Sequence, residues 1–525
     1  MNEFAMYTEY MSDRDAKCFS SQDRDFLEAV SGLVYANPFL PERIELEKRA
    51  LGELFQADAT NAWSKAAAWD RERPNVTALT DKVETLAMEF RDRLVDGATI
   101  AQGELTLYRN LVQYLLYYRV WDDLDQLIET PDRRTKVLKC WSSFQGHFDY
   151  FLKLPNREIP IQLQPAHLLA CFFQIRRAFH HIFDFVLGFS APAIQLRASI
   201  WQSIFTHDMQ RYQRSLYQRM SDIPTMITGP SGTGKELVAQ AIGLSRYVPF
   251  NVQQRKFEED YSRSFQPIHL AAMSPTLIES ELFGHCKGAF TGATSERSGR
   301  LEACSDSGSV FLDEIGEVSG EIQVKLLRVL QSREFYRVGE AEARHFSGKV
   351  LTATNRDLVA EVTNGSFRED LYYRLCADTI RTPGLREQLS DSPDDLANLV
   401  QFIAQRVAGD DEAESVSAEA MQWIQTSLPA EYAWPGNIRE LEQCVRNIMV
   451  RAVYSPVTEH CTASADELIL RQMDSGSLSA DELLQHYCAQ VYAKTNSYEQ
   501  TARMLKLDRR TVKSKVDAFH RRQVE

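Results

Sequence analysis

The sequence predicts a multidomain protein with an all-α N-terminal domain, a central α/β domain of the P-loop type with a helical lid, and an all-α helix-turn-helix domain at the C-terminus. Three observations support this fold class. The chain has 525 residues, which is too long for one hydrophobic core. Its first 200 residues are poor in glycine and carry apolar side chains at helical spacing. A strand, a glycine-rich loop and a helix then follow each other over residues 225–244, and a basic segment closes the chain.

Charge and hydropathy limit the classes of protein to which this chain can belong. A formal net charge of -14 argues against nucleic-acid binding along the whole chain, so DNA contact has to come from a local basic patch. The first residues lack the basic and apolar segments of a secretory signal, and the nine cysteines form no CxxC pair. The most apolar stretch, residues 168–189, carries too many charged side chains to span a bilayer. We therefore expect a cytoplasmic protein with reduced thiols and no membrane contact.

Residues 1–200 are expected to form a helical regulatory or sensor domain. Apolar side chains recur there at helical spacing, for example at Leu111, Leu115 and Tyr118. The alternating strands and helices of a phospho-receiver domain are not found in this region, so regulation by aspartyl phosphorylation is not supported. Aromatic stripes of this kind are typical of a packed core, and they leave open a small-molecule pocket or a protein-binding surface. We expect this domain to have a partner, either an unknown ligand or an unknown protein.

The remaining boundaries follow from changes in composition. Residues 201–383 alternate short apolar strands, glycine-rich turns and amphipathic helices, which is the pattern of an α/β nucleotide-binding domain. A helical lid is expected over residues 384–455. Residues 456–479 are rich in serine, threonine and acidic side chains and are predicted to be a linker. A small helical domain is predicted over residues 480–525.

A P-loop is predicted between the strand Thr225–Thr228 and a helix over Glu236–Leu244. Glycines let backbone N–H groups turn inward around phosphates, the helix N-terminus adds partial positive charge, and Lys235 neutralises the terminal phosphates. The predicted nucleotide-binding residues of the loop are Gly229, Ser231, Gly232, Thr233, Gly234, Lys235 and Glu236. Glu236 stands where a serine or threonine usually binds magnesium.

An acidic pair follows the apolar strand Val310–Leu312. Ligands of parallel sheets bind at the carboxyl ends of the strands, which is where Asp313 and Glu314 stand. Asp313 is therefore expected to hold Mg²⁺, and Glu314 to orient and polarise the water that attacks ATP. By itself such a pair could equally mark the start of a helix. The P-loop upstream favours the catalytic interpretation, with ATP and Mg²⁺ as cofactors.

The motif GAFTGA occupies Gly288–Ala293, between the P-loop and the acidic strand end. In this order the three segments resemble the central AAA+ ATPase module of bacterial enhancer-binding proteins, activators that use ATP to open promoters held by sigma-54 RNA polymerase. The motif contains no acid, base or metal ligand, and its glycines suit a loop that rises and falls. The resemblance implies that Phe290, Thr291 and Gly292 contact the sigma factor.

The resemblance also implies roles for four residues further along the chain. Asn355 matches the first sensor of the γ-phosphate, and Arg439 matches the second sensor, in the lid. Arg368 and Arg374 match the positions of arginine fingers, which stabilise charge on the transferred phosphate, often from a neighbouring subunit. The resemblance therefore implies self-association into a ring, typically a homo-hexamer. Without the motifs around it, each arginine would be interpreted as part of a surface ion pair.

Three segments depart from the family pattern. His269 stands where the family usually has asparagine; it can hydrogen-bond to Glu314, and a histidine changes charge near neutral pH. The hypothesis is an altered and pH-sensitive coupling between the water-polarising glutamate and the GAFTGA loop. Arg246–Phe265 is charged and longer than the family's usual connection, so it is expected to be a surface insertion. Pro230 replaces a residue that is commonly acidic, and nothing in the sequence explains the change.

Residues 501–516 are predicted to form two short helices around a turn. Their expected core face consists of Ala502, Leu505, Leu507, Val512 and Val516. The segment resembles the Fis-like helix-turn-helix of the same family. Lys506 stands where the turn usually has glycine, so either the turn differs or the lysine adopts a left-handed conformation. The second helix is expected to expose four cations, and the residues expected to bind double-stranded DNA are Arg509, Arg510, Thr511, Lys513 and Lys515.

The function that the resemblance implies is that of a sigma-54-dependent transcriptional activator. Such a protein binds upstream DNA and uses ATP hydrolysis in a ring-shaped oligomer to remodel sigma-54 RNA polymerase for promoter opening. Two alternatives remain: an AAA+ ATPase that remodels another target, and a DNA-binding regulator whose ATPase is vestigial. The Walker and GAFTGA residues of an active member are all present, which favours the activator.

Overall fold

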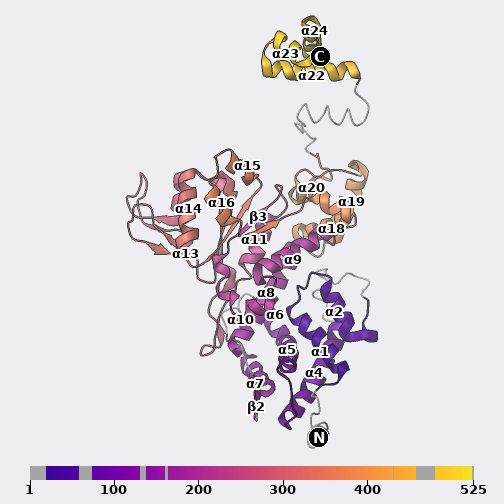
Figure 1. The fold of residues 1–525 in the computed structure, drawn as a ribbon, viewed down its shortest axis with the longest axis vertical. Helices are drawn as coiled ribbons and strands as arrows, with labels where there is room; N and C mark the ends of the chain where they lie inside the picture. The colour runs from indigo at the N-terminus through magenta and orange to yellow at the C-terminus, as the bar shows by residue number, and fades with distance from the viewer. Residues whose placement is uncertain are drawn as a thin grey trace, which may run out of the picture. The chain divides into compact units, whose positions relative to one another are not determined.

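The computed structural model describes residues 19–57, 74–130, 137–155, 157–159, 164–429, 431–456 and 479–522. The chain divides into two compact units, Met1–Val450 and Arg451–Glu525, and each is described by itself. Figure 1 shows their helices and strands. None of the described helices is long and apolar enough to cross a membrane.

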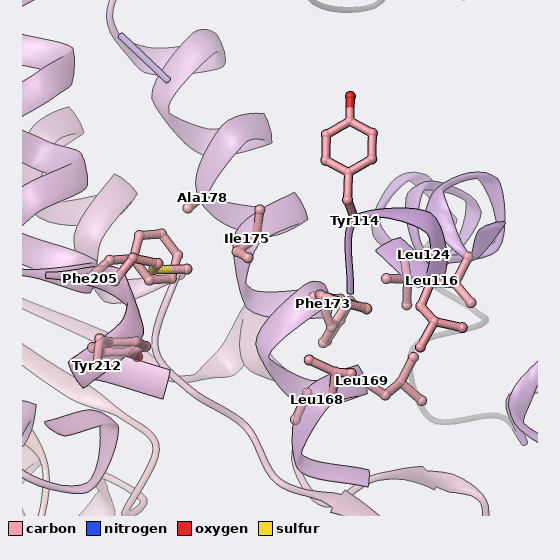
Figure 2. Close-up of a cluster of buried hydrophobic side chains, with 14 of the residues drawn as sticks. Tyr114, Leu116, Leu124, Leu168, Leu169, Phe173, Ile175, Ala178, Phe205 and Tyr212 are labelled. Atoms are coloured by element: carbon pink, nitrogen blue, oxygen red, sulfur yellow. The ribbon is translucent and has the colours of Figure 1, made fainter. Parts of the chain in front are cut away.

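The first unit begins with a set of packed helices, as the spacing of apolar residues predicts (Figure 1). These helices are α1 Ser21–Tyr35, α2 Glu42–Leu51, α4 Pro74–Val95, α5 Gln102–Arg119, α6 Trp121–Glu129, α7 Trp141–Leu152, α8 Pro165–Phe185, α9 Ala191–Phe205 and α10 Met209–Arg214. A short antiparallel pair, β1 Lys153–Leu154 and β2 Arg157–Glu158, follows α7. The apolar helix α8 is buried along most of its length, and Figure 2 shows its side chains among those of its neighbours.

A parallel sheet of five strands forms the centre of the α/β domain, in the order β13-β3-β12-β9-β6. The strands are β3 Thr225–Thr228, β6 Phe265–His269, β9 Ser309–Asp313, β12 Lys349–Thr354 and β13 Asp378–Arg381. The helices around them are α11 Lys235–Gly243, α12 Pro275–Phe283, α13 Arg300–Ala303, α14 Gly320–Ser332, α15 Leu358–Thr363 and α16 Glu369–Leu375. Every residue of β12 is buried, as expected of a central strand that is covered on both faces. Because the strands are parallel, their carboxyl ends meet at one edge of the sheet.

A helical lid follows the sheet. Its helices are α17 Leu385–Asp391, α18 Asp395–Ala408, α19 Ala413–Ser427 and α20 Asn437–Arg451. Short antiparallel hairpins extend from the α/β domain, with strands β4 Phe250–Asn251 and β5 Lys256–Phe257, β7 Gly284–His285 and β8 Arg297–Ser298, and β10 Glu334–Phe335 and β11 Arg344–His345. The predicted α/β domain with a helical lid is thus confirmed.

The segment Arg246–Phe265 is not the surface insertion that its charge suggested. Its hairpin carries Phe250 onto Trp141 of α7, with ring centroids 4.8 Å apart. It also stacks Phe257 on Phe173 of α8 at 4.0 Å. The aromatic side chains are buried against the helices, whereas the polar residues of the turn remain exposed. The prediction was wrong because the segment also contains aromatic side chains, and these pack against α7 and α8.

One hydrophobic core continues from the helices into the sheet. It includes Trp201 of α9 together with Ile227 of β3 and Phe311 of β9. The boundary at residue 200 falls inside α9 and remains a prediction. The helices before the sheet and the sheet itself therefore share buried surface, so a change in the packing of one alters the packing of the other.

The second unit contains α22 Ala480–Thr495, α23 Tyr498–Leu505 and α24 Arg509–Arg522 among its described residues. Its core consists of Cys488, Ala502, Val512 and Val516, with Leu505 and Leu507 packed against them. Lys506 has φ 53°, so the lysine accepts the left-handed conformation at the turn between α23 and α24. The two predicted helices and their core face are present, and α22 completes the core.

Lys349 at the start of β12 is the basis of a prediction about stability. It is 1% exposed, and its Nζ donates to the carbonyl oxygen of Ile223 at 2.6 Å. Burial, together with the cations Arg246 and Arg333, lowers its pKa from 10.5 to about 7. Between these two values the unfolded chain binds a proton that the folded chain has lost, so this residue makes stability rise with pH across that window.

Lys349→Met is expected to remove this contribution, which amounts to about 1.4 kcal/mol per pH unit at most. Denaturant midpoints of the wild-type and variant chains, measured from neutral to mildly alkaline pH, test it. The difference between the denaturant midpoints of the two proteins should shrink as the pH rises. A constant difference would contradict the prediction.

Candidate active site

The P-loop joins β3 to α11 at the carboxyl edge of the sheet. Gly229 and Gly232 have positive φ angles of 146° and 78°. A Cβ on Gly229 would lie 2.2 Å from Oγ1 of Thr382, just after β13. A Cβ on Gly232 would lie 2.2 Å from the carbonyl oxygen of Gly436 in the lid. Only glycine fits at these two positions, because the chain after β13 and the lid both approach the loop closely.

Lys235 opens α11 and is 7% exposed. Its Nζ donates to the carbonyl oxygens of Gly229 at 3.0 Å and Pro230 at 3.1 Å. Burial lowers the pKa of Lys235, while the carboxylates of Glu314 and Asp313 act to raise it. The lysine therefore lies within the field of the acidic strand end, where it can share the neutralisation of phosphate charge.

The other predicted residues of the loop differ in their contacts. The hydroxyl of Thr233 donates to the carbonyl oxygen of Pro230 at 2.8 Å and lies 2.7 Å from Oγ1 of Thr382. Ser231 and Glu236 are exposed. The loop is thus held in shape by Thr233, while its outer side chains remain accessible.

Asp313 and Glu314 lie half-buried at the end of β9. The N–H of Glu314 donates to Oδ1 of Asp313 at 3.1 Å, and the N–H of Asn355 donates to Oε2 of Glu314 at 3.3 Å. Glu314 has φ 56° and ψ 53°, a left-handed conformation that costs a residue other than glycine about 1–3 kcal/mol. Backbone strain of this kind clusters at active sites, where the surroundings hold a reactive group in place. The structure therefore brings Asn355 to the acidic pair.

His269 contacts Asp313 and not Glu314, which corrects the expectation from the sequence. Its Nδ1 lies 3.2 Å from Oδ2 of Asp313. The cause is strand register, since the parallel strands β6 and β9 pair His269 directly with Asp313. Glu314 lies one residue beyond that pair, in the left-handed conformation. If His269 couples the active site to the GAFTGA loop, it does so from Asp313, the carboxylate that is expected to hold the metal ion.

The donor set at this edge suits magnesium. Within the described residues, no group of three or more histidine, cysteine, aspartate or glutamate side chains is arranged to hold a metal ion by itself. Mg²⁺ keeps several waters and is usually bound by one or two carboxylates together with substrate phosphates. A half-buried Asp313 beside the P-loop lysine fits that manner of binding.

A cavity of about 480 Å³ lies beside the P-loop. Its lining comes from the P-loop and α11 (Thr233, Gly234, Leu237), from the lid (Leu399, Ile403, Ile438) and from the connection between α8 and α9 (Val186, Leu187). The walls are mostly apolar, and the position next to a phosphate-binding loop suits a nucleobase. Nothing in the sequence pointed to the α8–α9 connection, because it lies outside every motif.

The lid reaches the P-loop through the start of α20. The N–H of Arg439 donates to the carbonyl oxygen of Gly232 at 3.3 Å, and its Nη1 lies 3.5 Å from Oγ of Ser231. Asn437 ties the two parts together, because its Nδ2 donates to the carbonyl oxygen of Ser231 at 2.9 Å. Its Oδ1 accepts the N–H of Leu385 at 2.8 Å. Asn437 stands two residues before Arg439 in the second-sensor signature, yet only the structure reveals its contacts.

Arg368 and Arg374 lie on the surface at the two ends of α16. Nε and Nη2 of Arg368 donate to Oδ1 and Oδ2 of Asp370 at 3.0 and 2.7 Å. Across the described ranges, no hydrogen bond joins either arginine to the P-loop or to the acidic strand end. The structure does not bring them into the site of their own subunit, which is the placement expected of arginines that act on a neighbour.

The GAFTGA segment lies between β7 and β8 and is folded back on its own hairpin. The N–H of Gly288 donates to the carbonyl oxygen of the last residue of the motif at 2.9 Å. Phe290 is half-buried, and its ring packs edge-to-face on His285 with centroids 5.0 Å apart. Thr291 and Gly292 are exposed. In this conformation the threonine and glycine form the accessible tip, while the phenylalanine anchors the loop.

In the second unit, the cations of α24 are not all available. The residues exposed to solvent include Arg509, Arg510 and Lys513, and Thr511 is half-buried. Lys515 was expected to be exposed, but its Nζ is paired with the carboxylate of Asp481 on α22. Because Lys515 lies three residues after the buried Val512, it stands near the side of the helix that faces α22. That expectation is therefore wrong for Lys515.

Comparison with known proteins supports this arrangement of motifs. Residues 204–381 match the family model of the sigma-54 interaction domain, and residues 391–461 match that of the AAA+ ATPase lid domain. The Nif-specific regulatory protein of Azotobacter vinelandii is 41% identical over 253 residues, which are 48% of this chain and 43% of that protein. The DNA-binding transcriptional regulator NtrC of Azospirillum brasilense is 42% identical over 252 residues, which are 47% of each chain.

The matched region spans less than half the length of these relatives. The crystal structure of NtrX from Brucella abortus in complex with ATP is 24% identical and covers 69% of this chain and 77% of its own. Its TM-score of 0.38 is too low to support an argument about this fold. The two domain matches and the named relatives agree with the motifs of the site: the chain contains a sigma-54 interaction domain followed by an AAA+ ATPase lid domain, similar to those of the Nif-specific regulatory protein and NtrC.

Proposed function

We propose that this chain is an ATP-driven activator of transcription in the cytoplasm, which binds double-stranded DNA upstream of a promoter and remodels sigma-54 RNA polymerase. The observation that carries the proposal is the meeting of three elements at one edge of the sheet. The P-loop, the strained acidic end of β9 and the second-sensor segment of the lid all converge there. The match to the sigma-54 interaction domain supports the choice of client.

ATP hydrolysis requires positioning and charge neutralisation rather than covalent chemistry. We assign phosphate binding to the N–H groups of the P-loop, the N-terminus of α11 and Lys235. Asp313 would hold Mg²⁺, which supplies further positive charge to the phosphates when bound. Glu314 would accept a proton from the attacking water, and Asn355 and Arg439 would sense the γ-phosphate. The nucleobase would enter the apolar cavity between α11 and the lid.

Assembly into a ring follows from the position of the arginine fingers. Arg368 and Arg374 are exposed, and among the described residues neither makes a hydrogen bond to the acidic pair of its own chain. If they act in hydrolysis, a second copy of the chain has to supply them to the site. We therefore propose a ring, typically hexameric in this family, as the active form.

DNA binding is assigned to α24, and its exposed cations lead to a prediction. Arg510→Ala and Lys513→Ala are each expected to weaken binding to duplex DNA and to reduce the slope of log K against log salt by about 1. Lys515→Ala is the matched control on the same helix and is expected to change that slope less, because its charge is already paired with Asp481. Fluorescence anisotropy with the full chain over a salt series measures all three. Equal slopes for the three variants would contradict the assignment.

The proposed function is tested by combining the full chain, sigma-54 RNA polymerase and a sigma-54 promoter with an upstream binding site. Open complexes are expected with ATP and not with a non-hydrolysable analogue. ATP hydrolysis without promoter opening would favour an AAA+ remodeller of another target. DNA binding without any hydrolysis would favour a regulator with a vestigial ATPase.

A further inference from the structure

The helices that precede the sheet line a second cavity, of about 100 Å³, which is partly open. Its walls come from α1, α2, α5, α6, α8, α9 and α10 and are mainly apolar. The aromatic lining includes Tyr114, Tyr117, Trp121, Phe172, Phe179 and Trp201. Two of the lining residues, Tyr114 and Ile175, are labelled in Figure 2. An engineered apolar cavity of about 150 Å³ binds benzene, so this one admits at most a single small ring.

Two buried polar atoms of the lining have no hydrogen-bond partner among the described residues, Nε2 of Gln213 and the hydroxyl oxygen of Tyr117, and the hydroxyl lies beside the guanidinium of Arg176. Gln213 is 2% exposed, and its Oε1 accepts from Nε2 of Gln113 at 2.9 Å. Its own Nε2 is buried without a hydrogen-bond acceptor in the part of the chain that the structure describes. Buried amide groups are almost always hydrogen-bonded, and an unsatisfied one is costly. A molecule in the cavity that offers an acceptor would satisfy this donor.

The charged residues of the lining argue against an ionic ligand. Arg43 pairs with Glu47 at 2.9 Å. Arg176 pairs with Asp125 through two contacts of 2.7 Å. Both cations are thus neutralised by carboxylates of the protein, and an ion would lose its hydration without gaining a free partner. The wall therefore selects for an uncharged ring.

The cavity is connected to the P-loop helix through α8. Phe172 and Ile175 face the cavity, and Gln174 and Arg177 of the same helix bind the chain that follows α11. Nε2 of Gln174 donates to the carbonyl oxygen of Ser245 at 2.9 Å. The guanidinium of Arg177 donates to the carbonyl oxygens of residues 244 and 246 at 2.9 and 2.5 Å. These contacts hold the C-terminal end of the helix whose first residue is Lys235.

Gln213 is linked to the same contacts. The hydroxyl of Tyr212, its chain neighbour, donates to Oε1 of Gln174 at 2.8 Å. Beyond α8, the N–H groups of Phe189 and Ser190 donate to the buried carboxylate of Asp395 at the start of α18, at 2.8 and 2.9 Å. One helix and its following turn therefore touch the cavity, the P-loop helix and the lid.

We propose that this cavity is an effector site for an uncharged molecule of one aromatic ring that carries a hydrogen-bond acceptor, and that its occupancy changes ATP turnover through α8. Nε2 of Gln213 donates a hydrogen bond to the acceptor of the ligand, and the ring packs against Ile175 and Phe172. Binding is independent of the proposed function, whereas the effect on turnover rests on it.

The binding test uses the full chain with pyridine and benzene, two rings of the same size that differ by one acceptor nitrogen. Ligand-observed NMR titrations are expected to show pyridine binding about two- to tenfold tighter than benzene. Gln213→Met is expected to abolish that preference while benzene still binds. Gln218→Met, at an exposed glutamine nearby, is the matched control and retains it. Equal binding of the two rings to the wild-type chain would overturn the site, as would an unchanged preference in Gln213→Met.

The coupling test measures ATP turnover of the same proteins with saturating pyridine. A change of about twofold or more in kcat/KM is expected for the wild-type chain. Gln174→Leu is expected to keep the NMR preference for pyridine and to lose the change in turnover. Pyridine that binds without altering turnover would overturn the coupling. A wild-type chain with no ATP turnover would refute the proposed function, and the NMR comparison would still decide whether the cavity is a binding site.

Discussion

Glu314→Gln is expected to slow ATP hydrolysis by at least about a hundredfold, the usual loss when a general base is removed. The side chain keeps its size, so ATP binding should remain close to that of the wild-type chain. The geometry supports this separation of effects: Glu314 accepts the N–H of Asn355, and the phosphate ligands lie on the P-loop. Phosphate release in the steady state and binding of a fluorescent nucleotide measure the two quantities separately.

Glu317→Gln provides the matched control. Glu317 lies three residues further along the same loop, is exposed, and pairs with Arg356. Exposed ion pairs contribute about 1 kcal/mol or less, so hydrolysis should remain near the wild-type rate. Normal hydrolysis in Glu314→Gln would remove this residue from the catalytic role. Loss of nucleotide binding in that variant would instead assign it a structural one.

Thr291→Ala is expected to leave ATP hydrolysis largely intact and to abolish promoter opening. Thr291 is exposed at the tip of a loop that contains no acid, base or metal ligand, so it has no part in the chemistry. Loss of a residue at the centre of a contact with the sigma factor should reduce opening by about thirtyfold or more, as for an interface hot spot. Open-complex formation and phosphate release, measured in the same reactions, separate the two outcomes.

Thr294→Ala controls for the loss of a threonine hydroxyl in the same hairpin, since Thr294 is exposed just beyond the motif. It should retain promoter opening. If Thr291→Ala opened promoters at the wild-type rate, the tip of this loop would not be the contact with sigma-54. If it lost hydrolysis as well, the loop would be part of the active site and the assignment of a purely mechanical role would fail.

Local patterns predicted much of the site. The strand Thr225–Thr228 has the predicted bounds, and the apolar run before Asp313 lies within β9. A P-loop needs a strand, a glycine turn and a helix that are adjacent in sequence, so backbone preferences within about ten residues specify it. The two helices after residue 497 follow from apolar spacing in the same way, whereas the left-handed Lys506 was one of two possibilities that the sequence left open.

Contacts between distant segments could not be predicted. The bond of Asn437 to Ser231, the cavity wall from the α8–α9 connection and the burial of Phe250 on Trp141 all join parts of the chain that no local pattern relates. His269 and Lys515 were placed wrongly for the same reason. Strand register brought the histidine to Asp313, and the packing of α22 against α24 gave the lysine a carboxylate.

The sequence by itself determined that this chain carries a P-loop ATPase with a GAFTGA loop and a basic helical domain, because each depends on a short run of residues whose chemistry is local. The tertiary structure alone decided how the helical N-terminal region meets that ATPase. Its helix α8 binds the end of the P-loop helix through Gln174 and Arg177, and the turn after it binds the lid. Such contacts depend on which buried surfaces fit together, and that is settled only when the whole unit packs into one core.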